Sequence, residues 1–268
     1  MNHRTELLLA IKDLSKREIV KVKVPSEYPP EEGSYLRGND FSPVAVCVLL
    51  HTFYDKIPQY LQQLVKISVE SGAALAGYLQ TENVGIEKII CNIVANPNIR
   101  YLIVCGVESP GHQPGQTLSA LIQNGVDKRR RIIGAEAPTP YLYNIPLEAI
   151  ERFRKQIVLI NLALEEDRML ALKPEVIKNA IWACYQEEPT KFLHYTVYDV
   201  GAYSESPMLF KITWRVERPW MVLSEKEAEI LKRTNEAIEW RRREEERRKE
   251  DERLLSLLRP KKGSEEAK

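Results

Sequence analysis

The chain has little cysteine and no long apolar run. Its 268 residues include four cysteines, which lie singly and form no C-x-x-C pair, so neither a disulfide framework nor a thiolate metal site is expected. Their apolar surroundings predict that they are small core residues. The longest apolar run covers only residues 44–50, far short of the roughly 20 residues that span a bilayer. A membrane span is therefore not expected.

The chain also lacks an excess of charge and a phosphate-binding loop. Lys and Arg number 39 against 38 Asp and Glu, which gives a net charge of +1, so neither nucleic acid nor an anionic lipid surface is expected as a partner. No G-x-x-x-x-G-K-[ST] motif is present, so a phosphate-bearing ligand is the least favoured of the possible ligands. Residues 1–14 mix leucines with charged residues and lack a small-residue cleavage site. We therefore expect no signal peptide and a cytoplasmic location.

The middle of the chain alternates between short apolar runs and amphipathic segments. Asn83 stands where it can cap one of the expected helices, and a proline opens another. This alternation predicts an α/β fold with a doubly wound, mostly parallel, Rossmann-like sheet. The predicted strands are 44–50, 73–79, 100–105, 131–134 and 156–161, and the predicted helices are 57–70, 83–95, 115–124 and 146–155.

Histidine is scarce, with four in the chain, and His112 lies in a loop that follows a predicted strand. Such sheets bind ligands beyond the carboxyl ends of their strands, and glycine and proline on both sides of His112 keep its imidazole available to a metal or a proton. His51 follows the first core strand and is the second candidate ligand. His194 is expected to be a packed or surface residue of a strand, and His3 lies in a terminus that is expected to be mobile.

Many segments of the chain resemble one known family, in order and in spacing. The resemblance covers residues 28–162 and is to the A subunit of tetrahydromethanopterin S-methyltransferase. The segments that carry it are 33–39, 42–46, Gly77, 81–88, 96–101, 105–106, 111–112, 115–116, 123–126, 132–135 and 147–153.

The resemblance implies a corrinoid carrier of archaeal one-carbon metabolism. Such a carrier holds a cobamide whose cobalt takes a methyl group from methyl-tetrahydromethanopterin and passes it to the thiol of coenzyme M. The histidine that serves the cobalt corresponds to His112, which is therefore the expected catalytic and metal-binding residue. Imidazole suits the role, because methylated cobalt prefers a further axial nitrogen. The pterin donor and the thiol acceptor, or separate methyltransferase proteins, are the expected partners.

The loops 79–85, 106–116 and 134–141 are expected to enclose the cofactor. Their glycines would let the backbone approach a large flat ligand, although turn geometry alone explains them equally well. A ligating histidine also needs a partner for its other ring nitrogen, and Glu108, Glu82 and Glu136 are the alternatives. Besides His112, the predicted cofactor-binding residues are Gly77, Thr81, Glu82, Asn83, Gly85, Gly106, Glu108, Gly111, Gly115, Gln116, Gly134 and Glu136.

The predicted organisation has four parts: a helical extension over 1–27, the corrinoid-binding domain over 28–162, an α+β appendage over 163–222, and a charged helix with a tail over 223–268. The appendage is expected to contain a helix followed by two strands rich in aromatic and β-branched residues. The predicted bounds of these elements are 165–187, 191–200 and 208–216.

The last part predicts a long helix that Ser224 caps. Residues 241–253 interleave acidic and basic side chains, which favours a solvated helix over a nucleic-acid arm. Leucines at 254–258 then offer a surface for a partner or for self-association. These additions favour one alternative function, a non-catalytic interaction or regulatory module that keeps the fold but has lost the corrinoid.

Overall fold

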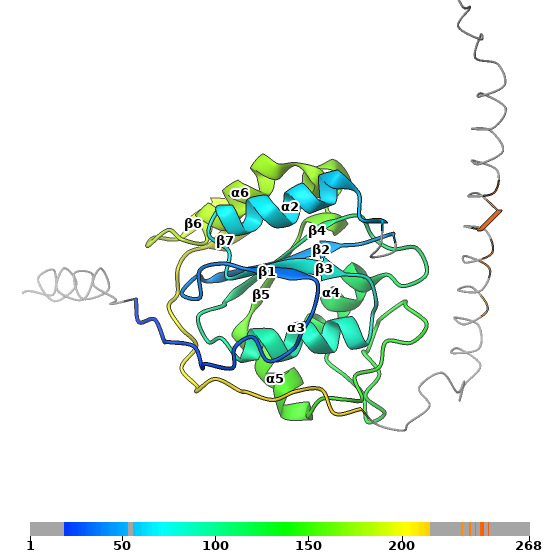
Figure 1. Ribbon diagram of the computed structural model, residues 1–268, viewed down its shortest axis with the longest axis horizontal. Coiled ribbons are helices and arrows are strands. Elements are labelled where there is room, and N and C mark those ends of the chain that lie inside the picture. Colours follow the sequence, from blue (N-terminus) through cyan, green and yellow to red (C-terminus); the bar gives the residue numbers. More distant parts are fainter. Residues whose placement is uncertain are drawn as a thin grey trace, which may run out of the picture.

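A computed structural model describes residues 19–52 and 56–214, together with six positions further along the chain (232, 236, 239, 242, 243 and 246). The described part is an α/β structure in which a five-stranded mixed sheet is covered by helices on both faces (Figure 1). Helices α2 and α6 lie on one face, and α3 and α5 lie on the other. The α/β class that the alternation predicts is confirmed.

The sheet has the strand order β1-β3-β2-β4-β5. Strands β2 to β5 are parallel, and β1 at the edge pairs antiparallel with β3. The connection from β3 to β4 passes over β2, so the chain reverses its direction of travel across the sheet between β2 and β4. The strands are β1 Tyr35–Arg37, β2 Val44–Leu49, β3 Leu75–Leu79, β4 Tyr101–Gly106 and β5 Val158–Asn161.

The helices bury one apolar side against this sheet. Strands β2 and β4 are buried along their whole length, as expected for central parallel strands between two helical layers. Asn83 caps α3 as predicted, because its side chain accepts a hydrogen bond from the Val84 amide. The helices are α2 Gln59–Glu70, α3 Val84–Val94, α4 Pro114–Asn124, α5 Leu147–Gln156 and α6 Pro174–Ala183.

Several expectations about secondary structure are wrong. Strand β1 is not among the predicted strands, because its three residues are too few to show a periodic pattern. Residues 131–134 form only isolated bridges, since Gly134 turns the chain at φ +81°. The single helix over 165–187 is instead a 3₁₀ turn at Arg168–Leu172 followed by α6, which begins at a proline. The strand over 208–216 is an irregular strap as far as residue 214.

This strap still follows a period of two. Met208, Phe210 and Ile212 pack against the core, while Leu209 is exposed. The strap crosses the side of the molecule that carries α3 and α5, where Met208 N donates to Val94 O at 2.9 Å and Thr213 N donates to Asn144 O at 3.0 Å. Its alternation is that of a strand, but its hydrogen bonds go to loops and helix ends. The period therefore indicates which side chains are buried without indicating a sheet.

The strand predicted over 191–200 is instead a short hairpin. Its strands are β6 Thr190–Phe192 and β7 Tyr195–Val197. At the amino-terminal end, residues 19–27 contain no helix, and 1–18 lie outside the described residues. The predicted helix that begins at Ser224 also lies outside them, apart from the six positions named above, which are helical. Two of its predicted features, the Ser224 cap and the leucines at 254–258, are not described.

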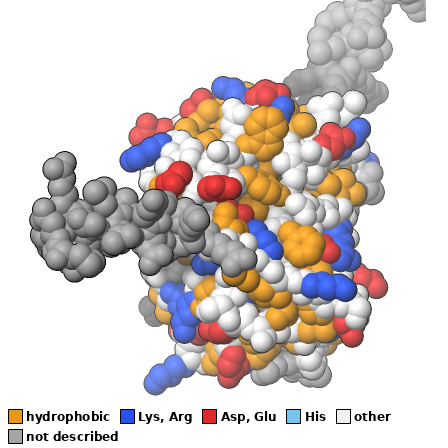
Figure 2. Space-filling model, turned by 90° about the vertical axis from the view of Figure 1, so that its left-hand side faces the viewer, with side chains coloured by type: hydrophobic (Ala, Val, Ile, Leu, Met, Phe, Trp, Pro, Cys, Tyr) orange, Lys and Arg blue, Asp and Glu red, His pale blue; other side chains and the backbone are white. Residues whose placement is uncertain are grey.

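Charged side chains of both signs are mixed on the surface. Figure 2 shows Lys and Arg side chains interspersed with Asp, Glu and apolar ones on the face that it draws. Within the described ranges, no helix combines the length and the apolarity that crossing a membrane would require.

Candidate functional site

Two predicted residues from different loops meet at the carboxyl edge of the sheet. Glu82 follows β3, His112 follows β4, and the Nδ1 atom of His112 lies 2.7 Å from Oε2 of Glu82. The Glu82 side chain is fully buried, whereas that of His112 is 44% exposed. The buried carboxylate thus holds one edge of an imidazole whose ring reaches solvent.

A third loop completes the arrangement through the other carboxylate oxygen. Oε1 of Glu82 accepts two hydrogen bonds from Thr139, from the amide at 3.2 Å and from the hydroxyl at 2.7 Å. Asn83 adds longer bonds from its side-chain amide to Thr139, at 3.3 and 3.4 Å. Thr139 is not among the predicted site residues. Its loop is identified by its place after a predicted strand, but nothing in the sequence distinguishes this threonine from its neighbours.

The local chain geometry brings His112 to this position. The amides of His112 and Gln113 both donate to Ser109 O, at 3.2 and 2.9 Å, which folds the loop into a turn. Gln113 has the left-handed φ of +41°, and Pro114 then opens α4, where its missing N–H removes no helical bond. The turn and the helix start fix where the histidine backbone can lie.

The charge state of Glu82 suits the role of a histidine partner. Burial alone would raise the pKa of Glu82, but hydrogen bonds from His112 and Thr139 outweigh it and hold the pKa below its usual value. An ionised carboxylate accepts a hydrogen bond from Nδ1–H and thereby places the lone pair of a neutral imidazole on Nε2. Nε2 is therefore the ring nitrogen suited to ligate a metal.

The other two acidic candidates have different roles. Glu108 accepts hydrogen bonds from the amides of Gly115 and Gln116, each at 3.0 Å, so it caps α4 and does not orient His112. Burial raises the pKa of Glu108, although these amides oppose the shift. Glu136 has an exposed side chain. Of the three alternatives that the sequence leaves open, the geometry selects Glu82.

Gln116 links α4 to the 134–145 loop with both ends of its amide. Its Nε2 donates to Gly134 O, and its Oε1 accepts from the amide of Glu136, each at 3.0 Å. The loop is thus attached to α4 by Gln116 and to the α3 end by the contacts between Glu82 and Thr139. Gln116, Gly134 and the Glu136 backbone therefore lie together.

The predicted glycines differ in where they lie relative to the carboxyl edge of the sheet. Gly106 ends β4 at φ +90°, and a Cβ there would lie 2.6 Å from Leu49 O, so backbone geometry requires glycine. Gly77 lies within β3 opposite Tyr35, away from the carboxyl edge, so the structure does not bring it to His112. The remaining predicted positions lie on the loops or first helical turns near this edge: Thr81, Gly85, Gly111, Gly115 and Gly134.

The other histidines have separate positions. His51 follows β2 at the same edge of the sheet and is partly buried. His194 lies in the turn between β6 and β7, not within a strand, and is 63% exposed with Nδ1 3.7 Å from Glu165. His3 lies outside the described residues.

Comparisons with known proteins agree on one family. The family model for the A subunit of tetrahydromethanopterin S-methyltransferase matches residues 21–218. This range is longer at both ends than the predicted 28–162, and it includes the hairpin and the strap. The expectation that the family resemblance ends at residue 162 is therefore wrong.

Several relatives are similar over most of their length. The A subunit numbered 2 of tetrahydromethanopterin S-methyltransferase from Methanothermobacter thermautotrophicus is 41% identical over 195 residues, which cover 72% of this chain and 91% of the relative. The A subunit numbered 1 from Methanothermobacter marburgensis is 42% identical over 196 residues, covering 72% and 71%. The A subunit from Methanopyrus kandleri is 41% identical over 190 residues, covering 70% and 67%. The chain belongs to the family of the A subunits of tetrahydromethanopterin S-methyltransferase.

Proposed function

We propose that the chain is a corrinoid-binding methyl carrier or methyltransferase component of pterin-linked one-carbon metabolism, with His112 as the axial ligand of cobalt. The observation that carries this proposal is the contact between His112 and the buried, ionised Glu82, in a member of this family. A bound cobamide supplies cobalt that accepts a methyl group and passes it on. Because the corrin ring provides its own nitrogen ligands, a single imidazole from the protein is enough.

The residues around His112 fit this group. Glu82 holds Nδ1, so the ring keeps one orientation and presents Nε2. Thr139 holds Glu82 from the opposite side, which keeps the carboxylate from turning away. The loops 79–85, 106–116 and 134–141 would contact the bound corrinoid. In this role His112 binds the metal, Glu82 positions His112, and Thr139 positions Glu82.

The position of His112 in the sheet supports a doubly wound fold. In a doubly wound, Rossmann-like sheet the ligand crevice opens at the carboxyl ends of the strands, where the strand order reverses. Here the order reverses between β2 and β4, and His112 leaves the carboxyl end of β4. We therefore treat the sheet as a doubly wound domain whose added edge strand is β1.

The names of the relatives support a class of donor and a class of acceptor. They contain tetrahydromethanopterin and S-methyltransferase, that is, a pterin and the transfer of a methyl group to sulfur. We propose that this chain exchanges a methyl group with such a pterin and such a thiol in the cytoplasm, either directly or through separate methyltransferase proteins. A partner or a second copy would dock through the C-terminal helix.

Reconstitution tests the proposal against its rival. The purified chain is incubated with hydroxocobalamin, separated from free corrinoid by gel filtration, and measured for cobalt and protein. One cobalt per chain supports a corrinoid carrier. A folded chain that retains no cobalt would instead indicate the alternative, an interaction or regulatory module that has lost the corrinoid.

A further inference from the structure

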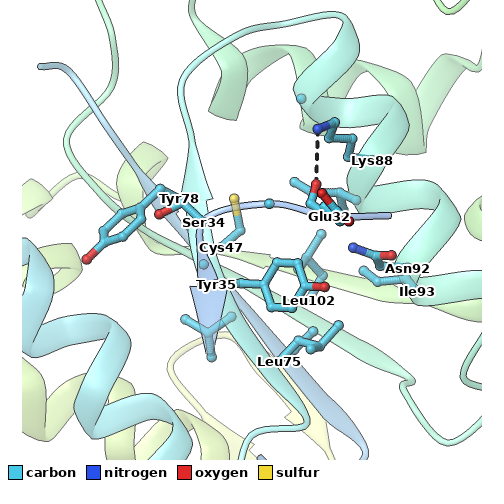
Figure 3. A pocket seen from close by; sticks show the side chains of 16 residues that line it. Glu32, Ser34, Tyr35, Cys47, Leu75, Tyr78, Lys88, Asn92, Ile93 and Leu102 are labelled. Carbon is cyan, nitrogen blue, oxygen red and sulfur yellow. Dashed lines mark hydrogen bonds between the residues drawn. The ribbon is translucent and has the colours of Figure 1, made fainter. Parts of the chain in front are cut away.

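A cavity lies between the sheet and α3, and His112, Glu82 and Thr139 do not line it (Figure 3). Its volume is about 480 Å³, within the range of roughly 300–1,000 Å³ that small-molecule pockets occupy. Residues 32–35, which lead into the edge strand β1, line one side of it. The proposed corrinoid site does not account for this space.

Small residues line part of the cavity. Ala45 and Cys47 on β2 lie beside Gly77 on β3, and Gly85 lies on the first turn of α3. Protein interiors are normally filled, with few voids larger than a water molecule. The other buried residues of β2 and β4 are mostly larger and branched. The void is therefore a local feature of this stretch of sheet.

Larger apolar residues form the walls. Figure 3 shows Tyr35, Leu102 and Ile93 facing the same space, and Leu75 and Ile89 also line it. The cavity thus has a sheet on one side and a helix on the other, with apolar surface on both. Such a slot suits the flat body of a ring-containing molecule better than it suits water.

The rim is held in place by α3. Asn92 accepts from the amide of Glu31 at 2.9 Å and donates to its carbonyl at 3.1 Å. Lys88 Nζ donates to Glu32 O at 3.0 Å, and the Tyr35 hydroxyl donates to Glu31 O at 3.0 Å. Four hydrogen bonds therefore fix the segment that precedes β1, so the mouth is formed before any ligand arrives.

The mouth carries a cation that pairs with no carboxylate in the described part of the chain. Lys88 bonds to a backbone carbonyl, and none of the ion pairs among the described residues includes it. The side chain of Glu32 is exposed and is available to water. A ligand with an anionic end would gain a charge-assisted hydrogen bond from Lys88, while its body entered the apolar slot.

We propose that this cavity binds a small amphiphilic anion, with an apolar, ring-containing body between the sheet and α3 and a carboxylate or sulfonate at Lys88. Of the predicted corrinoid-binding residues, Gly77 and Gly85 line this cavity, whereas His112, Glu82 and Thr139 do not.

Two fluorescent probes of similar shape test the charge requirement. 8-Anilinonaphthalene-1-sulfonate carries the anion, and N-phenyl-1-naphthylamine is its neutral counterpart. The folded full-length chain should bind each probe at one saturable site. Lys88→Gln should weaken binding of the sulfonate about tenfold and leave the neutral probe unchanged. The control Lys155→Gln, an exposed lysine on α5, should alter neither.

A filling variant tests the location. Cys47→Leu places a larger apolar side chain in the lining of the cavity, so it should abolish binding of both probes while thermal unfolding shows that the chain remains folded. Unchanged probe binding by folded Cys47→Leu would overturn the assignment. Equal effects of Lys88→Gln and Lys155→Gln on binding of the sulfonate would contradict the claim that Lys88 binds the anionic end of the ligand. This comparison can be made even if Cys47→Leu does not fold.

Discussion

Glu82 Oε2 and His112 Nδ1 lie 2.7 Å apart, although 30 residues separate them in the chain. One side chain leaves β3 and the other leaves β4, so the contact exists only because the sheet brings two carboxyl ends to one edge. The buried partner is the acid, and the exposed partner is the base. This arrangement fixes the imidazole through Nδ1 and leaves its side chain partly exposed to solvent.

The first prediction concerns the acid. Glu82→Gln should weaken hydroxocobalamin binding about 10–100-fold, because an amide orients a ligating histidine less well than a carboxylate. Equilibrium dialysis measures the affinity. Glu70→Gln is the matched control, since Glu70 is exposed at the end of α2 and belongs to none of the predicted site loops, and it should bind like the unaltered chain. Equal affinities of Glu82→Gln and Glu70→Gln would show that Glu82 does not position the ligand.

The second prediction concerns the threonine that holds Glu82. Thr139→Val removes the hydroxyl that donates to Oε1 at 2.7 Å, and a buried bond to a charged group contributes about 1.5–3 kcal/mol. The free energy of unfolding should fall by about that amount, as measured by urea denaturation. Thr139→Ser keeps the hydroxyl and should restore most of the loss. If serine and valine destabilise the chain equally, the hydroxyl contributes nothing.

The third prediction gives the pH dependence of the same pair. Folding lowers the pKa of Glu82 from its ordinary value of 4.5, so its stabilisation is fully present above pH 4.5 and is lost as pH falls through the lowered pKa. The difference in free energy of unfolding between the unaltered chain and Glu82→Gln should therefore shrink as the pH falls below 4.5.

Urea denaturation from pH 3 to pH 7 measures this difference. Burial raises the pKa of two other carboxyl groups, Glu87 and Glu108, but both are present in each protein and their contributions cancel. A difference that grows as the pH falls below 4.5 would contradict the assignment of a lowered pKa to Glu82.

The fourth prediction concerns the glycine that ends β4. Gly106→Ala should destabilise the chain by about 1–3 kcal/mol, because φ is +90° and the new Cβ would lie 2.6 Å from Leu49 O. Gly33→Ala is the control, since its Cβ would meet only the Tyr35 ring, at 3.2 Å. Thermal unfolding should show a large loss for the first variant and a small one for the second. Similar melting temperatures would contradict a backbone requirement for glycine at position 106.

The central sheet was largely predictable from local patterns. The apolar run at 44–50 and the side chain of Asn83 give local signals, buried parallel strand and helix cap, that tertiary contacts do not override. Strand β1 carries no such signal, because its pairing to β3 depends on Gly77 accepting the close approach of Tyr35. Residues 131–134 have strand composition but lie in a loop whose turn is made by a glycine.

The site was predictable only in part. His112 stood out by its rarity and by its turn-rich surroundings, and Glu82 was one of three acidic candidates. Choosing among the three requires knowing which carboxylate is buried against the histidine and which one caps α4, and both facts depend on the packing of loops. Thr139 could not be found at all, because a hydroxyl that supports a carboxylate leaves no pattern in a single sequence.

The most direct test of the account is the absorption spectrum of the cobalt after reconstitution with hydroxocobalamin, compared between the unaltered chain, His112→Ala and His51→Ala. If His112 ligates the cobalt, the spectrum should shift on binding in the unaltered chain and in His51→Ala, and the shift should be lost in His112→Ala with weaker binding. A shift that survives in His112→Ala and disappears in His51→Ala would contradict the account and assign the ligand to His51.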